Sequence, residues 1–163
     1  VSSKTSDGLR RREDLARIII ADDDPIIVEI VREILESEGH IVGALGDGTR
    51  VREVLEAKLP DLLILDCSMP GKSGIEVLRE VRGSELCRRI PVMMLTARSS
   101  RSDEEIAYYS GVDEYIAKPF DSQQLVLRVN AMLEHGTRIA PLPTSSDGTT
   151  QSDERPGRRI ARL

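Results

Sequence analysis

Polar side chains that could carry out phosphate chemistry follow short apolar runs in this sequence. Three consecutive aspartates follow the first apolar run, a single aspartate follows a later one, and a threonine and a lysine end two more. Because the carboxyl ends of parallel strands meet at one edge of a sheet, we expect these groups to lie together. In chain order they are Asp22, Asp23, Asp24, Asp66, Thr96 and Lys118.

Clustered carboxylates repel one another, which raises the pKa of at least one of them unless a cation lies among them. Hard oxygen ligands suit Mg²⁺, which keeps several waters and takes few protein carboxylates. Such an ion can bridge to a phosphoryl oxygen, and the groups of Lys118 and Thr96 can bind two others. A carboxylate can also act as a nucleophile and form an aspartyl phosphate. These residue types therefore predict magnesium-dependent phosphoryl chemistry.

The apolar runs alternate with helical patterns, which predicts five strand–helix units and a parallel sheet covered by helices on both faces. Asp24 suits the N-cap of the first helix, Pro25 its first position, and Gly39 its end. The pattern Ser102-x-x-Glu105 predicts a capping box at the fourth helix. We expect strands near 18–21, 40–45, 62–65, 92–95 and 114–117, and helices near 25–37, 49–58, 73–82, 102–110 and 121–134.

Length and composition exclude several classes of protein. The 163 residues correspond to about one domain, and the net charge of −5 argues against a nucleic-acid binder. Aromatic residues make up only 2%, too few for base-stacking platforms. No apolar run approaches the ~20 residues of a membrane span, and no signal peptide is recognisable. Cys67 and Cys87 have no metal-ligand spacing and indicate a reducing cytoplasm, with both thiols inert.

Charge and composition divide the chain into three parts. We interpret 17–135 as the folded domain, 1–16 as a flexible N-terminal extension and 136–163 as a flexible tail or linker. The last part is rich in Gly, Pro, Ser and Thr and buries too little apolar surface to offset its ordering entropy. Both ends are mildly basic, so the folded part holds the acidic excess.

Four motifs in the folded part resemble the receiver domain of two-component response regulators, of the chemotaxis-receiver type. Each motif is weak alone, but their order and spacing are specific to that family. The resemblance implies a flavodoxin-like (βα)5 α/β fold with a five-stranded parallel sheet of order 2-1-3-4-5. The motifs are Ile18-Ile-Ile-Ala-Asp-Asp-Asp-Pro25, Leu63-Ile-Leu-Asp-Cys-Ser-Met-Pro-Gly71, Met94-Leu-Thr-Ala97 and Tyr115-Ile-Ala-Lys-Pro-Phe120.

The resemblance also implies a role for each site residue. Asp66 is the expected phosphoacceptor, assisted by Lys118 and Thr96, and the Lys118–Pro119 peptide bond is expected to be cis. Thr96 and Tyr115 are the expected switch pair, although Tyr115 alone could be core filler. The expected ligands of Mg²⁺, for which Mn²⁺ can substitute, are Asp22, Asp23, Asp66 and the backbone carbonyl of Ser68.

The implied partners are a histidine kinase or phosphotransfer protein and, through a surface of roughly 101–135, an output domain, a downstream protein or a second copy of the chain. No membrane contact is expected, and nucleic acid is reached only through an output domain. The protein is expected to be cytoplasmic and not an enzyme, apart from catalysing its own phosphorylation and dephosphorylation. Ser68 and Arg98 are expected to flank the phosphoryl entry path and to tune how long the phosphate lasts.

Two other functions compete with this interpretation. Asp22-x-Asp24 also resembles the nucleophile motif of haloacid-dehalogenase-type phosphohydrolases, with Asp22 phosphorylated and Asp24 as acid and base. That family needs a further acidic pair after a late strand, and Asp113 and Glu114 precede theirs instead. A receiver-like docking module that works without phosphorylation is the third possibility, although no essential residue is missing.

Overall fold

The computed structural model describes residues 15–135, so the predicted flexible tail 136–163 and residues 1–14 of the predicted N-terminal extension 1–16 lie outside the described residues. Ala16, assigned by the prediction to the N-terminal extension, is only 7% exposed and belongs to the folded unit. Strands and helices alternate strictly along the chain. They are β1 (Arg17–Ala21), α1 (Pro25–Ser37), β2 (Ile41–Leu45), α2 (Val51–Lys58), β3 (Leu62–Leu65), α3 (Gly74–Gly83), β4 (Val92–Thr96), α4 (Arg101–Tyr109), β5 (Glu114–Ala117) and α5 (Ser122–His135).

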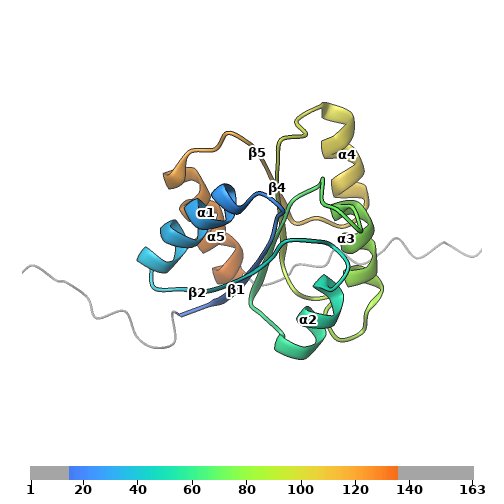
Figure 1. Ribbon diagram of the computed structural model, residues 1–163, viewed down its shortest axis with the longest axis horizontal. Helices are drawn as coiled ribbons and strands as arrows, with labels where there is room; N and C mark the ends of the chain where they lie inside the picture. Colours follow the sequence, from blue (N-terminus) through green and yellow to red (C-terminus); the bar gives the residue numbers. More distant parts are fainter. Residues whose placement is uncertain (1–14, 136–163) are drawn as a thin grey trace, which may run out of the picture.

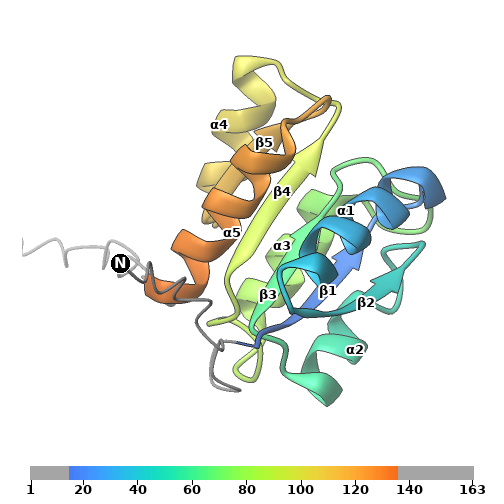
Figure 2. The ribbon, with the colours of Figure 1, turned by 90° about the vertical axis from the view of Figure 1, so that its left-hand side faces the viewer.

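The five strands form one parallel sheet in the order β2-β1-β3-β4-β5, as predicted. Helices α1 and α5 cover one face, and α2, α3 and α4 cover the other (Figures 1 and 2). Every residue of β3 and β4 is buried, because these central strands have helices on both faces. This burial explains why the strands appear in the sequence as continuous apolar runs.

Side chains alternate between two cores, one on each face of the sheet. In β3, Leu62 and Ile64 face α1 and α5, whereas Leu63 and Leu65 face α2, α3 and α4. All four are almost completely buried. The two cores together fix the sheet between its helix layers, so its edge is a rigid support for the polar groups that follow the strands.

Helix α1 begins and ends as predicted. The Asp24 carboxylate accepts hydrogen bonds from the backbone N–H groups of Ile26 and Ile27, and Pro25 occupies the first helical position. Gly39, just after the helix, has a φ of 93°, which costs little only for glycine. Asp24 is therefore used as a helix cap.

The predicted capping box at Ser102 and Glu105 is wrong. Helix α4 begins at Arg101, and its N-cap is Ser100, whose hydroxyl accepts a hydrogen bond from the N–H of Asp103. Ser100 has the extended backbone that an N-cap needs, whereas Ser102 already lies in the first turn. A capping box that the sequence analysis did not single out, Ser73 with Glu76, begins α3.

Candidate functional site

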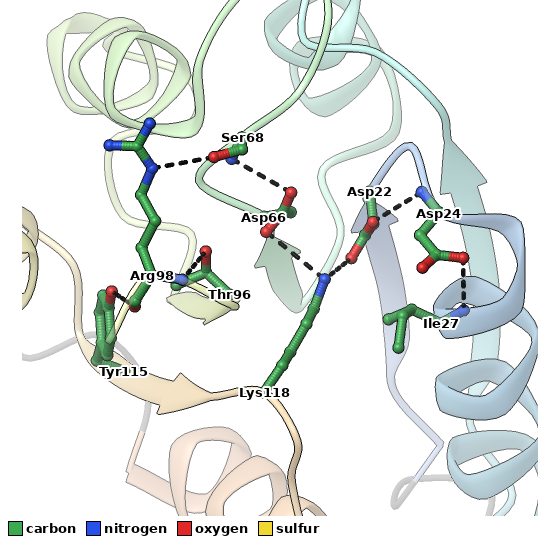
Figure 3. Close-up of polar contacts among 9 residues, drawn as sticks. All are labelled: Asp22, Asp24, Ile27, Asp66, Ser68, Thr96, Arg98, Tyr115 and Lys118. Atoms are coloured by element: carbon green, nitrogen blue, oxygen red, sulfur yellow. Dashed lines mark hydrogen bonds and ion pairs between the residues drawn. The ribbon is translucent and has the colours of Figure 1, made fainter. Parts of the chain in front are cut away.

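The residues predicted to do chemistry meet at the carboxyl-end edge of the sheet (Figure 3). Ala21 of β1 pairs in register with Leu65 of β3, so the next residues, Asp22 and Asp66, follow neighbouring strands. Thr96 ends β4, and Ala117 of β5 pairs with it. Lys118 follows directly and reaches back across the edge toward the acids. The strand order thus brings together residues that are far apart in the chain.

Three carboxylates form a cluster at this edge. One oxygen from each of Asp22, Asp23 and Asp66 lies within 4.8 Å of the others. Asp22 and Asp66 are 4% and 6% exposed, whereas Asp23 is exposed to solvent. Backbone N–H groups orient the two buried acids, that of Asp24 donating to Asp22 at 2.9 Å and that of Ser68 donating to Asp66 at 3.2 Å.

The ammonium group of Lys118 faces the two buried acids. Lys118 Nζ lies 2.6 Å from Asp22 Oδ2 and 3.6 Å from Asp66 Oδ1. Its side chain is 14% exposed, so solvent weakens these ion pairs less than it would at the open surface. The Lys118–Pro119 peptide bond is cis.

The pKa of Asp66 is raised above its ordinary value. Burial is the largest cause, because it penalises the charged carboxylate, and the nearby Asp22 raises the pKa further. Attraction by Lys118 and hydrogen bonds from Thr96 and Ser68 act in the opposite direction. The three clustered carboxylates carry more negative charge than Lys118 neutralises, which favours a second cation.

The donor set fits a hard divalent cation. The three acids offer only carboxylate oxygens, the ligand type that Mg²⁺ takes, and the exposure of Asp23 leaves one side open to water. The cluster could therefore hold a metal ion. Asp24, the fourth aspartate of the sequence motif, is not part of the cluster because its carboxylate caps α1.

Thr96 and Tyr115 are connected through the backbone of Arg98. Thr96 is 1% exposed, and its hydroxyl accepts a hydrogen bond from the N–H of Arg98 at 3.3 Å. The Tyr115 hydroxyl donates to the carbonyl of Arg98. Burial raises the pKa of Tyr115 to about 12, so the phenol stays protonated and remains a donor. Tyr115 also packs against the core beneath α3 and α4.

Sequence reasoning placed Ser68 and Arg98 beside the site but did not anticipate their contact. Arg98 Nε donates to Ser68 Oγ at 3.0 Å, and another guanidinium nitrogen lies 3.7 Å from Asp103 on α4. Arg98 thus connects the loop after β3, through the contact with Ser68 drawn in Figure 3, with the first turn of α4. The only signal in the sequence was the position of each residue two places after Asp66 and Thr96.

Both cysteines are buried free thiols. Burial raises the pKa of the Cys67 thiol, with the charge of Asp66 adding to the effect, so the reactive thiolate is disfavoured. This agrees with the expectation that Cys67 is inert, while the inertness of Cys87, which is fully buried, stays a prediction.

No helix within residues 15–135 combines the length and the apolar character that crossing a lipid bilayer requires.

Known proteins resemble this chain over the folded part. The family model described as response regulator receiver domain matches residues 18–130. The phosphate regulon transcriptional regulatory protein PhoB of Rhizobium meliloti is 40% identical over 119 residues, which are 73% of this chain and 52% of that protein. The chain spans about half the length of the curated relatives it matches.

Two solved structures show the same arrangement of the chain. A putative response regulator from Chloroflexus aurantiacus has a TM-score of 0.71 and 32% identity, covering 74% of this chain and 98% of that one. The receiver domain of a sensor histidine kinase from Pseudomonas aeruginosa has a TM-score of 0.69 and 28% identity, with the same coverage of both chains. The latter structure has a magnesium ion coordinated in its active site cleft.

Proposed function

Because the chain belongs to the response regulator receiver family, we propose that it accepts a phosphoryl group on Asp66 and uses it as a signal. The observation that carries this proposal is the position of the Asp66 carboxylate, which is nearly buried in an acid cluster that could hold a cation and lies 3.6 Å from Lys118 Nζ. A histidine kinase or a phosphotransfer protein is the proposed donor. The chain would catalyse its own phosphorylation and dephosphorylation and turn over no separate substrate.

In the proposed reaction, a carboxylate oxygen of Asp66 attacks the phosphorus of a phosphohistidine on the donor. The new P–O bond forms as the P–N bond breaks, and the departing imidazole takes up a proton from water. Lys118 pairs with an oxygen of the transferring group and stabilises its charge. Attack by water on the aspartyl phosphate then returns Asp66 and releases inorganic phosphate.

Asp22, Asp23, Asp66 and the backbone carbonyl of Ser68 would hold Mg²⁺ or Mn²⁺. When bound, the ion supplies positive charge beside the phosphoryl oxygens. The acids of this chain already have the oxygen chemistry and the spacing that such an ion needs. Asp22 would then have two tasks, orienting Lys118 and binding metal.

We propose that the switch begins at Thr96. A phosphoryl oxygen on Asp66 would draw the Thr96 hydroxyl toward it and weaken the hydrogen bond from the Arg98 N–H. The Tyr115 hydroxyl, bonded to the carbonyl of the same Arg98, would lose its present position. The surface of α4, β5 and α5 would change shape and report to an output domain, a downstream protein or a second copy of the chain.

The test compares wild type with Asp66→Asn and Asp24→Asn after incubation with acetyl phosphate and Mg²⁺. We expect wild type and Asp24→Asn to gain one phosphoryl group by intact mass, because asparagine caps a helix as well as aspartate does. We expect Asp66→Asn to gain none. Equal labelling of all three proteins would contradict the assignment and favour Asp22 as the nucleophile.

A docking module that works without phosphorylation predicts a different result. In that case wild type would gain no phosphoryl group and would not bind Mg²⁺ or beryllofluoride. Asp24, as the helix cap of α1, does not support the phosphohydrolase alternative, in which it is the acid and base.

A further inference from the structure

The loop between β2 and α2 packs unusually closely on the loop that follows Asp66. Gly48 is buried, and its N–H donates to the carbonyl of Pro70 at 3.2 Å. A Cβ atom added to Gly48 would overlap the backbone carbonyl oxygen of Lys72 and lie 2.9 Å from its Cβ. The two backbones therefore touch with no side chain of Gly48 between them.

Gly48 is required here for its small size. Its φ does not lie in the left-handed region, which other residues rarely adopt, so the conformation itself suits any residue. Gly71, in the loop after β3, lies close to the β2–α2 loop as well, because a Cβ added to Gly71 would lie 2.5 Å from Thr49 Cγ2. Gly71 has a φ of 79°, so a substitution there would be strained for two reasons, whereas a substitution at Gly48 tests the contact alone.

The clamped loop is the one that carries the proposed metal and phosphoryl ligands. It runs from Asp66 through Ser68 to the start of α3, where the N–H of Gly74 donates to the carbonyl of Cys67 at 2.9 Å. A Cβ on Gly74 would overlap the backbone oxygen of Asp66. The loop is thus fixed by α3 on one side and by Gly48 on the other.

We propose that Gly48 is a positioning residue for the proposed phosphorylation site. By closely packing on Pro70 and Lys72, it sets the position of the loop and hence of the Ser68 carbonyl and Asp66 carboxylate that would bind the cation. This inference rests on the proposed function, since it concerns how well the same site holds Mg²⁺. Groups that orient metal ligands typically change affinity by about 10- to 100-fold when they are removed.

Gly46 offers a matched control in the same loop. A Cβ added there meets nothing within 4 Å, and its φ is also outside the left-handed region. Gly46→Ala and Gly48→Ala therefore make the same chemical change two residues apart, one in open space and one in the contact.

The experiment measures the Mg²⁺ dissociation constant of the full chain by calorimetry for wild type and both variants, with the melting temperature without Mg²⁺ recorded for each. We expect about tenfold weaker binding for Gly48→Ala and unchanged binding for Gly46→Ala. A lower melting temperature with an unchanged dissociation constant would make Gly48 merely structural and would overturn the inference. Normal labelling of wild type on Asp66 in that same case would leave the proposed function standing.

A second measurement keeps the inference testable if Gly48→Ala does not fold. In wild type titrated with MgCl₂, the amide resonances of Gly48 and Ser68 should shift with the same concentration dependence, whereas that of Gly46 should not. An unchanged Gly48 resonance would overturn the inference. If wild type binds no Mg²⁺ at all, both the inference and the proposed function fail.

Discussion

The two ends of the sheet hold charged side chains in opposite ways. At the amino-end edge, the Arg82 guanidinium donates to the carbonyls of Gly111, Arg88 and Ile90 and forms an ion pair with Asp113 at 2.7 Å. At the carboxyl-end edge, three carboxylates form a cluster, and the ammonium group of Lys118 pairs with two of them, Asp22 and Asp66.

At the amino-end edge, Asp113 Oδ2, the oxygen that pairs with Arg82, also accepts a hydrogen bond from the N–H of Val92 at 2.8 Å. Arg82 thereby ties α3 to the loops before β4 and β5, with nearly all its donors used. The three clustered acids at the other edge carry more negative charge than Lys118 neutralises. Charge that is fully paired stabilises the fold, whereas charge left in excess is available for a ligand.

The largest effect we expect is on stability at the amino-end edge. Arg82→Met would leave Asp113 without its cation and three carbonyls without a donor, lowering the free energy of unfolding by about 3 kcal/mol. Urea unfolding measures this change, and phosphoryl labelling of the folded variant should match wild type. Arg101→Met is the control, because Arg101 pairs with Glu105 at 2.9 Å but is 92% exposed, and should change stability by less than about 0.5 kcal/mol. If Arg82→Met and Arg101→Met lowered the free energy of unfolding equally, the paired charge at the amino-end edge would not stabilise the fold more than an exposed surface pair does.

The second-largest effect we expect is on stability at the carboxyl-end edge, and it requires bound Mg²⁺. At a Mg²⁺ concentration about 100 times the dissociation constant, binding to the folded state alone adds about 2.7 kcal/mol to the free energy of unfolding. Asp23→Asn removes one exposed ligand, and a tenfold weaker site would keep only about 1.4 kcal/mol of that gain. Without Mg²⁺ the variant should be at least as stable as wild type, because one like charge is gone.

Asp61→Asn is the matched control for that measurement. Asp61 accepts the N–H of Arg17 at the opposite edge of the sheet, and asparagine can accept the same hydrogen bond. Mg²⁺ should raise the free energy of unfolding of Asp61→Asn by as much as it raises that of wild type. A reduced gain in Asp61→Asn would mean that the ion is not bound at the acid cluster.

A smaller effect concerns the cap of α4, the helix that Arg98 connects to the site. Ser100→Ala should lower the free energy of unfolding by about 1 kcal/mol, because the N–H of Asp103 loses its acceptor. Ser102→Ala should leave stability unchanged or slightly raised, because alanine is the better helix former inside the first turn. Thermal unfolding of both variants gives the comparison. A larger loss in Ser102→Ala would restore the capping box that the sequence suggested.

The sequence predicted the strands and the site because both depend on short-range patterns. Continuous apolar runs such as Leu62–Leu65 mark buried strands, and parallel packing brings Asp22, Asp66 and Lys118 to one edge. Ser100 and Ser102 are each followed by an acid three residues later, so only the backbone geometry decides between them.

Other features depend on tertiary contacts that no local pattern encodes. Arg82 lies on a helix where an arginine is usually solvated, and its partners come from two separate loops. Gly48 looks like an ordinary turn residue until the loop after β3 is placed against it. The same holds for the contact between Arg98 and Ser68, which joins two loops 30 residues apart.

The smallest effect is the pH dependence of stability, which has opposite signs at two acids. Burial raises the pKa of Asp66 above 3.8, so the folded protein binds this proton more readily than the unfolded chain. Ionised Asp66 therefore lowers the free energy of unfolding at neutral pH, and this loss disappears as the pH falls through the raised pKa toward 3.8. Without Mg²⁺, Asp66→Asn should be more stable than wild type at pH 7, and the difference should shrink on acidification.

The pKa of Glu76 is shifted in the opposite direction to that of Asp66. Hydrogen bonds from Ser73 lower the pKa of Glu76 below 4.5, so its ionised form stabilises the fold above that pH, and the contribution is lost as the pH falls through the lowered pKa. Glu76→Gln should be less stable than wild type at pH 7 and approach it in acid. The free energies of unfolding of both variants, measured in urea from pH 7 to about pH 3, should converge on that of wild type, from above for Asp66→Asn and from below for Glu76→Gln. If the stability advantage of Asp66→Asn grew on acidification, ionised Asp66 would stabilise the fold as Glu76 does, and the excess of negative charge at the carboxyl-end edge would not destabilise it.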